Sequence, residues 1–202
     1  NASGPGSTAM GVGTTASGSA STAMGAGTNA SGPVSTAMGS FTNASGNTST
    51  AMGEFTTASG SVSTAMGNQT TAPSYAETAV GRYNTTYTPA SATAWNTADR
   101  LFVVGNGTGT GANSSNALTI TKDGTMNIND AYNMPTADGT ANFVMSTNGA
   151  GLVSFVDPNT LVTPTTTNTL DGAYDQGGAG AGREIDAVDG TVAITGEDGI
   201  MV

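Results

Sequence analysis

The stretch NASGPGSTAMGVGT, residues 1–14, is the first of six consecutive blocks of equal length that share one pattern. The later blocks begin at residues 15, 29, 43, 57 and 71, and no insertion separates them. The sixth block keeps the spacing, but it carries Pro73 and has Val80 where the others have methionine. A short fixed period is typical of proteins whose repeats stack on their neighbours. The sequence therefore predicts a stack of 14-residue coils that ends at the sixth block.

A weaker period of seven divides each block, because ASGxxST is followed by AMGxxTT. We therefore predict that one coil consists of two strands and two turns, with a glycine at each turn. Glycine adopts positive φ at little cost, whereas inside a helix each glycine would cost roughly 1 kcal/mol. The glycines predicted at the turns of the coils are Gly4, Gly11, Gly18, Gly25, Gly32, Gly39, Gly46, Gly53, Gly60, Gly67 and Gly81.

Alternation of side chains along a strand assigns the faces of the coil. If Ala2 and Ala9 point into the lumen, Ser3 points to water and Met10 points outward on the other side. Burying one methionine contributes roughly 1.5–3 kcal/mol, so a methionine column favours lateral association, and we infer a homotrimer with methionine near its axis. The alternative is a solitary solenoid with methionine in the lumen and alanine outside. The residues predicted at the trimer interface are Met10, Met24, Met38, Met52, Met66, Val80 and Trp95.

The ASGxxSTAMG blocks resemble the head repeats of trimeric autotransporter adhesins, and the resemblance covers residues 1–84. It implies a left-handed parallel β-roll packed as a homotrimer, and a role in binding host matrix or other surfaces. That family commonly has valine and isoleucine where this chain has Thr8 and Met10.

Composition excludes several classes of function. The formal net charge is −10, and the only cations are Arg82, Arg100, Lys122 and Arg183, so the chain lacks the basic surface that nucleic acid requires. It has no Cys and no His, which removes thiolates, imidazole bases and the usual zinc ligands. No apolar run is long enough to span a bilayer, so we expect no membrane insertion in this segment. We expect a non-enzymatic chain without cofactors, and an excerpt of a longer polypeptide, because it begins without Met.

The pattern changes after residue 84. We predict a neck at residues 85–105, which contains Trp95, a β-hairpin shaft module at 106–156, and a Gly-rich β shaft module at 157–202. Residues 117–129 read as a hairpin around a Lys-Asp-Gly turn. The stretches at residues 101–107, 134–142, 147–155 and 170–175 are similar to modules of bacteriophage tail fibres and of Bacteroidetes-type surface proteins, and that resemblance implies a trimeric fibre shaft.

Two motifs suggest a ligand-binding site, but the sequence around each does not fit that site. Residues 178–183, GAGAGR, have the glycines of a phosphate loop, but no apolar strand precedes them. Asp171 with Asp175, and Asp186 with Asp189, lack the full pattern of a calcium loop. We therefore assign no catalytic, cofactor or metal residue.

The sequence thus predicts an all-β, extracellular fibre segment that supports adhesion or receptor binding. It favours the tail fibre of a virion or injection particle over a cell-anchored adhesin at a bacterial surface, and host-surface glycan or protein is the expected partner besides the chain itself. Two other hypotheses remain. A regular column of threonines that begins at Thr8 is compatible with an ice- or crystal-binding solenoid. A glycan-cleaving tailspike would require a carboxylate pair, which the sequence does not nominate.

Overall fold

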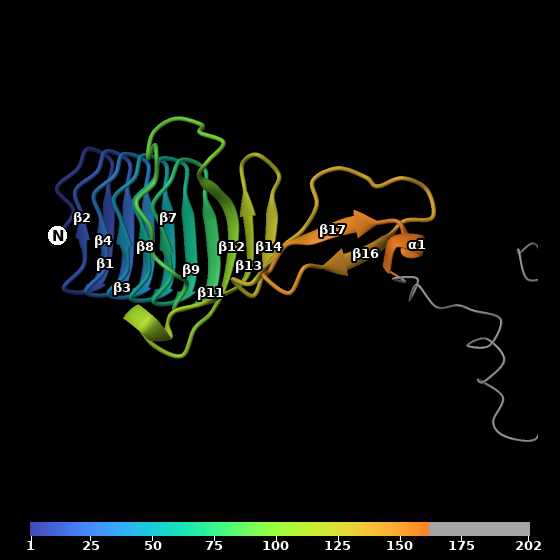
Figure 1. Ribbon diagram of the computed structural model, residues 1–202. Coiled ribbons are helices and arrows are strands. Elements are labelled where there is room, and N and C mark those ends of the chain that lie inside the picture. Colours follow the sequence, from blue (N-terminus) through green and yellow to red (C-terminus); the bar gives the residue numbers. More distant parts are fainter. Residues whose placement is uncertain (162–202) are drawn as a thin grey trace, which may run out of the picture. The chain divides into compact units, whose positions relative to one another are not determined.

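The computed structural model describes residues 1–161, and their regular secondary structure is almost entirely β (Figure 1). The chain divides into two units, Asn1–Pro158 and Asn159–Val202. Most of the predicted Gly-rich module, with residues 178–183 and the four aspartates weighed as calcium ligands, lies outside the described residues.

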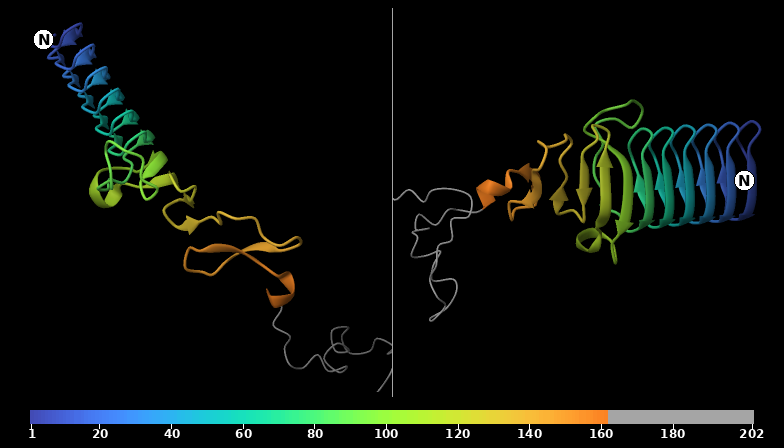
Figure 2. Two further views of the ribbon diagram at one scale, coloured as in Figure 1. Left: turned by 90° about the horizontal axis from the view of Figure 1, so that it is seen from above. Right: turned by 90° about the vertical axis from the view of Figure 1, so that its right-hand side faces the viewer.

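Each coil from residue 15 to 84 contains one short and one long strand, whereas the first coil contains its long strand and an isolated bridge from Ala2 to Ala16. Equivalent strands of successive coils pair in parallel (Figure 2). The register advances by one repeat, so Met10 pairs with Met24 and Ala16 pairs with Ala30. The fold predicted from the period, an all-β stack of 14-residue coils, is thereby confirmed. The long strands are β1 (Thr8–Val12), β3 (Thr22–Ala26), β5 (Thr36–Ser40), β7 (Thr50–Glu54), β9 (Thr64–Asn68) and β11 (Thr78–Arg82). The short strands are β2 (Thr15–Ala16), β4 (Asn29–Ala30), β6 (Asn43–Ala44), β8 (Thr57–Ala58) and β10 (Thr71–Ala72).

The core of the coil stack consists of two columns of alanine. Every alanine from Ala16 to Ala79 at these two positions has no exposed surface. The alternative with methionine in the lumen is therefore wrong, because the narrow space between the two sheets holds methyl groups. The buried alanines are Ala16, Ala23, Ala30, Ala37, Ala44, Ala51, Ala58, Ala65, Ala72 and Ala79.

Hydroxyl side chains line the rest of the lumen, which the sequence did not predict. One threonine and one serine per coil are buried beside the alanines. Ser21 and Ser49 donate to the carbonyls of Gly18 and Gly46 at 2.7 Å. The hydroxyls of Thr28, Ser35, Thr42, Thr56, Ser63 and Thr70 are buried and make no hydrogen bond to the described residues.

The glycines of the repeat serve close packing between coils. Gly11 and its equivalents through Gly81 lie inside the long strands, where the sequence had placed turns. A Cβ on Gly25 would lie 1.9 Å from the carbonyl oxygen of Gly39, and one on Gly18 would lie 2.1 Å from that of Gly32. The left-handed backbone of the corners falls instead at positions such as Val34 (φ 58°) and Phe41 (φ 51°). The prediction that Gly11 and its equivalents lie at turns is therefore wrong. These positions require glycine because the backbone of the next coil leaves no room for a Cβ.

The neck and the following strands extend the sheet of long strands. β12 (Arg100–Asn106) pairs in parallel with β11, and β13 (Asn116–Thr121), β14 (Met126–Ile128) and β15 (Tyr132–Asn133) continue the sheet in antiparallel order. The predicted hairpin at residues 117–129 is confirmed by the pairing of β13 with β14. A separate hairpin is formed by β16 (Val144–Thr147) and β17 (Val153–Val156), and the remaining elements are η1 (Gly111–Asn113) and α1 (Pro158–Leu161).

Candidate interaction surfaces

The five methionines of the repeat stack in register on the outer face of the long-strand sheet. The exposed fraction of the side chain is 55% for Met10 and 41% for Met66, and the three between them are half-buried. Val80 follows Met66 in the same column. The structure thus brings the predicted interface residues of the coils together on one face.

This column continues beyond the repeat. Val80 pairs with Val104, Val104 with Leu118, and Leu118 with Ile128, so each successive strand adds an apolar side chain in the same register. Tyr132 ends the series opposite Ile128. We call this series, from Met10 to Tyr132, the apolar column.

A second apolar series runs beside it in the neck strands. In the coils, the outward-facing threonines form a column that starts at Thr8 and ends at Thr78. The next strands continue this column with Phe102, Ile120 and Met126. Sequence reasoning missed this continuation, although Phe102-Val103-Val104-Gly105 matches Thr78-Ala79-Val80-Gly81 position by position, which is the signal that would have found it.

Trp95 lies apart from these paired positions, in the loop between β11 and β12, and 54% of its side chain is exposed. The ammonium of Lys122 lies 5.6 Å from the centroid of its ring. This contact involves Trp95 in holding the neck of its own chain, and its role in a trimer stays a prediction.

A polar network closes the lumen at the sixth coil. Glu77 occupies the position of the lumen serines and has no exposed surface. Its carboxylate accepts hydrogen bonds from the Ser74 amide at 3.0 Å and the Tyr87 hydroxyl at 3.1 Å. Lys122 donates to the Ser74 hydroxyl at 3.0 Å, which donates to the carbonyl of Arg100 at 3.0 Å. The network therefore joins the last coil to β12 and β13.

Burial shifts the titration of this network. Removal from water raises the pKa of Glu77 above its ordinary value, against the opposing effect of the Ser74 hydrogen bonds. The same cause lowers the pKa of Lys122 and raises the pKa of Tyr87 to about 12. Burial thus makes the charged form of each group less favourable than it is in water.

The neck is held by buried acceptors. Asp99 is buried, and its carboxylate accepts from the amides of Ala90 at 2.6 Å and Ser91 at 3.0 Å. The Arg100 guanidinium donates to the Thr85 carbonyl at 2.6 Å. Hydrogen bonds to charged groups are stronger than exposed ion pairs, so this arrangement fixes the loop more firmly than exposed ion pairs would.

Asn84 ends the short-strand sheet. Its side-chain oxygen accepts from the Thr71 amide at 2.8 Å, and its side-chain nitrogen donates to the Thr71 carbonyl at 2.9 Å. The amide group therefore satisfies β10 as one more strand would, and it protects an edge that could otherwise pair with another chain.

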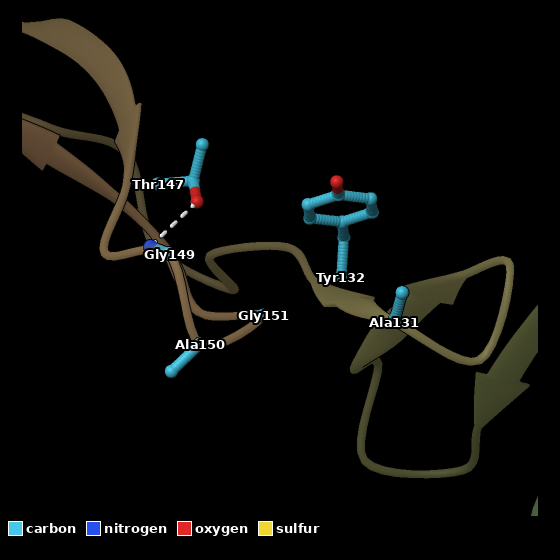
Figure 3. Close-up of a pocket in the computed structure, with 6 residues that line it drawn as sticks. All are labelled: Ala131, Tyr132, Thr147, Gly149, Ala150 and Gly151. Atoms are coloured by element: carbon cyan, nitrogen blue, oxygen red, sulfur yellow. Dashed lines mark hydrogen bonds between the residues drawn. The ribbon is translucent and has the colours of Figure 1, made fainter.

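A hollow of about 140 Å³ lies at the corner of the last coils, where the loop that contains η1 approaches Phe55, Gln69 and Tyr83. A more open hollow of about 320 Å³ lies between the segment at Ala131–Tyr132 and the turn of the β16–β17 hairpin. Figure 3 shows Tyr132 and Thr147 flanking this second hollow, with the Thr147 hydroxyl accepting a hydrogen bond from the Gly149 amide at 3.0 Å.

Neither hollow is lined by an acid, a lysine or an arginine, so neither offers acid–base chemistry. Within residues 1–161, no three acidic, histidine or cysteine side chains are grouped closely enough to hold a metal ion. No helix in that range combines the length and apolar character needed to cross a membrane.

The repeat itself identifies the N-terminal part of the chain. Residues 2–28, 16–42, 30–56 and 44–70 each match the family model for two copies of the YadA head domain repeat. No curated protein and no solved structure matches the chain. Residues 2–70, with their parallel coils and columns of stacked alanine and methionine, therefore match the YadA head repeat, the repeat of trimeric autotransporter adhesin heads.

Proposed function

We propose that this chain is a structural segment of an extracellular homotrimeric fibre whose subunits pack through the apolar column. The observation that carries the proposal is the register of that column, which places apolar side chains at one position from Met10 to Tyr132. The described residues leave much of this face exposed, and a contiguous apolar surface of this kind marks a protein interface.

A trimer is favoured over other oligomers by the head repeats, because they are those of trimeric adhesins. Burying a methionine fully contributes roughly 1.5–3 kcal/mol. The side chains that already lie half-buried gain less, so association rests on many small contributions along the fibre. Val104, Leu118 and Ile128 extend the interface past the coils.

The role supported by the head repeats is adhesion by a non-enzymatic segment at an outer surface. Within that role we propose the tail fibre of a virion or injection particle, with the cell-anchored adhesin as the alternative. The sequence likeness of residues 101–107, 134–142 and 147–155 includes tail-fibre modules and bacterial surface proteins alike, so flanking sequence tests the choice: a particle-attachment domain would indicate the first, and a membrane barrel or sorting domain the second. We propose the same division as the sequence predicts, with coils to residue 84, a neck to 105, and shaft modules at 106–156 and 157–202.

Two other functions find less support. The threonine column that suggested an ice-binding solenoid shares its sheet face with the methionines, so the proposed trimer would cover both. The buried carboxylates Glu77 and Asp99 could not reach the glycan that a tailspike cleaves, because their exposed fractions are 0% and 1%.

The mass of the protein in solution, measured by light scattering during size exclusion, tests the trimer. Three chains of 19.6 kDa are expected in one particle. The double variant Met38→Gln, Met52→Gln should weaken association, because it places two amides in the interface. The matched control Ser31→Gln, Ser45→Gln changes exposed residues near the short strands and should remain trimeric. A stable wild-type monomer, or equal dissociation of both double variants, would overturn the proposal.

A further inference from the structure

One corner of the coil stack carries an exposed aromatic ladder. The corner position beside the end of each long strand is filled, in successive coils, by Gly13, Gly27, Phe41, Phe55, Gln69 and Tyr83. The rings of Phe41 and Phe55 stack with centroids 5.2 Å apart and planes 5° from parallel. Both side chains are about half exposed, at 58% and 47%. The repeat therefore builds a stack of rings on its own surface.

The ladder is interrupted at Gln69. Phe55 and Tyr83 are two coils apart, which corresponds to about 10 Å at roughly 4.8 Å per coil. Carbon atoms in contact lie about 3.5–4.0 Å apart, so a flat ring between two others needs about 7–8 Å. The interval between Phe55 and Tyr83 is therefore wide enough to admit one ring above the flexible Gln69 side chain.

The hollow of about 140 Å³ lies at this interruption, and the loop around η1 forms its outer wall. Two backbone bonds anchor the loop, from Gly107 to the Arg82 carbonyl at 3.2 Å and from Ser115 to the Tyr83 carbonyl at 3.1 Å. The Ser115 hydroxyl also donates to the Asn106 side chain at 2.6 Å. The wall is thus fixed by the same residues that end the coil stack.

The polar groups in the hollow are neutral, and three of the side chains are available. The side chains of Gln69, Thr86 and Thr110 line it, and they make no hydrogen bond to the rest of the described chain. The Asn84 amide also lines it but is occupied by Thr71. No charged side chain lines the hollow, and the Arg82 guanidinium lies outside the lining, 5.3 Å from the centroid of the Tyr83 ring.

We propose that this hollow binds one neutral hexose or N-acetylhexosamine ring of a surface glycan. A pyranose ring has a C–H face that packs on the electron-rich face of an aromatic ring, and an edge of hydroxyls that bind amides and hydroxyls. Phe55 and Tyr83 provide the first kind of contact, and Gln69, Thr86 and Thr110 provide the second. The volume fits a single ring, since sites for larger ligands measure about 300–1,000 Å³. The inference rests on the proposed adhesive role and names its ligand class.

Saturation-transfer NMR on the whole chain tests the site, with four probes: the methyl glycosides of N-acetylglucosamine, galactose, glucose and mannose. We expect at least one to bind with a dissociation constant on the order of millimolar, as for a single small ring. Phe55→Gln should weaken that binding about tenfold or more. Val34→Gln should change it less than about twofold, because Val34 is an exposed left-handed corner of the coils that does not line the hollow. Gln69 at φ 52° shows that glutamine is compatible with the corner position of Phe55.

Filling the hollow provides a second test. Thr110→Trp should abolish binding, whereas Thr108→Trp, in the same exposed loop but not in the lining, should not. The assignment is overturned if none of the four glycosides binds the wild type, or if the members of either pair of variants behave alike. Attachment of beads coated with the chain to a cell layer measures adhesion separately. Attachment without glycoside binding would reject the site alone, and glycoside binding without attachment would reject the adhesive role alone.

Discussion

The lumen hydroxyls make a sharp prediction, because the fold buries them without a partner. Thr56 has no exposed surface, and its hydroxyl makes no hydrogen bond to the described residues. Proteins lose about 1–3 kcal/mol when a hydroxyl is buried unpaired. Valine has nearly the shape of threonine and removes the hydroxyl, so Thr56→Val should increase the free energy of unfolding by about 1–3 kcal/mol.

Urea unfolding followed by circular dichroism measures this change, with all proteins at one concentration because association affects apparent stability. For a chain of this size, each 1 kcal/mol corresponds to about 2–4 °C in melting temperature. The neighbouring Thr57 faces outward on β8, so Thr57→Val serves as the control and should change stability by less than about 0.5 kcal/mol.

A loss of stability in Thr56→Val would refute the reasoning, because it would mean that the hydroxyl contributes favourably in the folded protein. Equal gains in Thr56→Val and Thr57→Val would refute it as well, since the effect would then come from strand preference and not from the lumen.

Two further predictions concern the lumen cap and the coil spacing. Because burial raises the pKa of Glu77, its ionisation opposes folding, so Glu77→Gln should gain stability relative to wild type as pH rises above the ordinary value of 4.5, and the two should converge below it. Urea midpoints at pH 4 and pH 7 check this sign, and a difference that is constant with pH would contradict it. Gly39→Ala should cost more than about 3 kcal/mol, since φ is 120° and the new Cβ would lie 2.0 Å from the Gly53 carbonyl oxygen. Gly6→Ala is the control, because φ is 68° there and no atom lies within 4 Å of the new Cβ, so it should lose only the backbone cost of about 1–2 kcal/mol. Thermal unfolding measures both variants. Equal losses of stability in Gly39→Ala and Gly6→Ala would show that the close approach of neighbouring coils does not matter.

The period and the inward alanines followed from the sequence because both depend only on repetition and strand alternation. The positions of the corners did not. The seven-residue half-repeat suggests two equal halves, yet the strands contain five and two residues, so Gly11 falls inside β1 instead of at a turn. The period fixes how coils stack but not where the chain bends.

The candidate surfaces show the same division. The methionine column could be predicted from one strand, whereas its continuation through Val104 and Leu118 depends on pairing across a loop of varied sequence. The sequence does not show that Glu77 and Asp99 are buried. Only the folded neck shows that the Tyr87 hydroxyl donates to Glu77 and that a backbone amide donates to Asp99. The hollow beside Phe55 is formed in part by the loop around η1, and that loop is not part of the repeat, so the repeat could not predict the hollow.

Because neighbouring coils pair in the same register, the length of the coil stack can change without a change in the contacts between coils. Each 14-residue unit presents the same alanine, glycine and methionine positions to the unit before and after it. Duplication or deletion of one unit would therefore change the reach by about 4.8 Å while leaving every remaining contact surface intact. The repeat acts as a molecular ruler, and genetic copying of a short DNA segment can lengthen it without requiring a new interface.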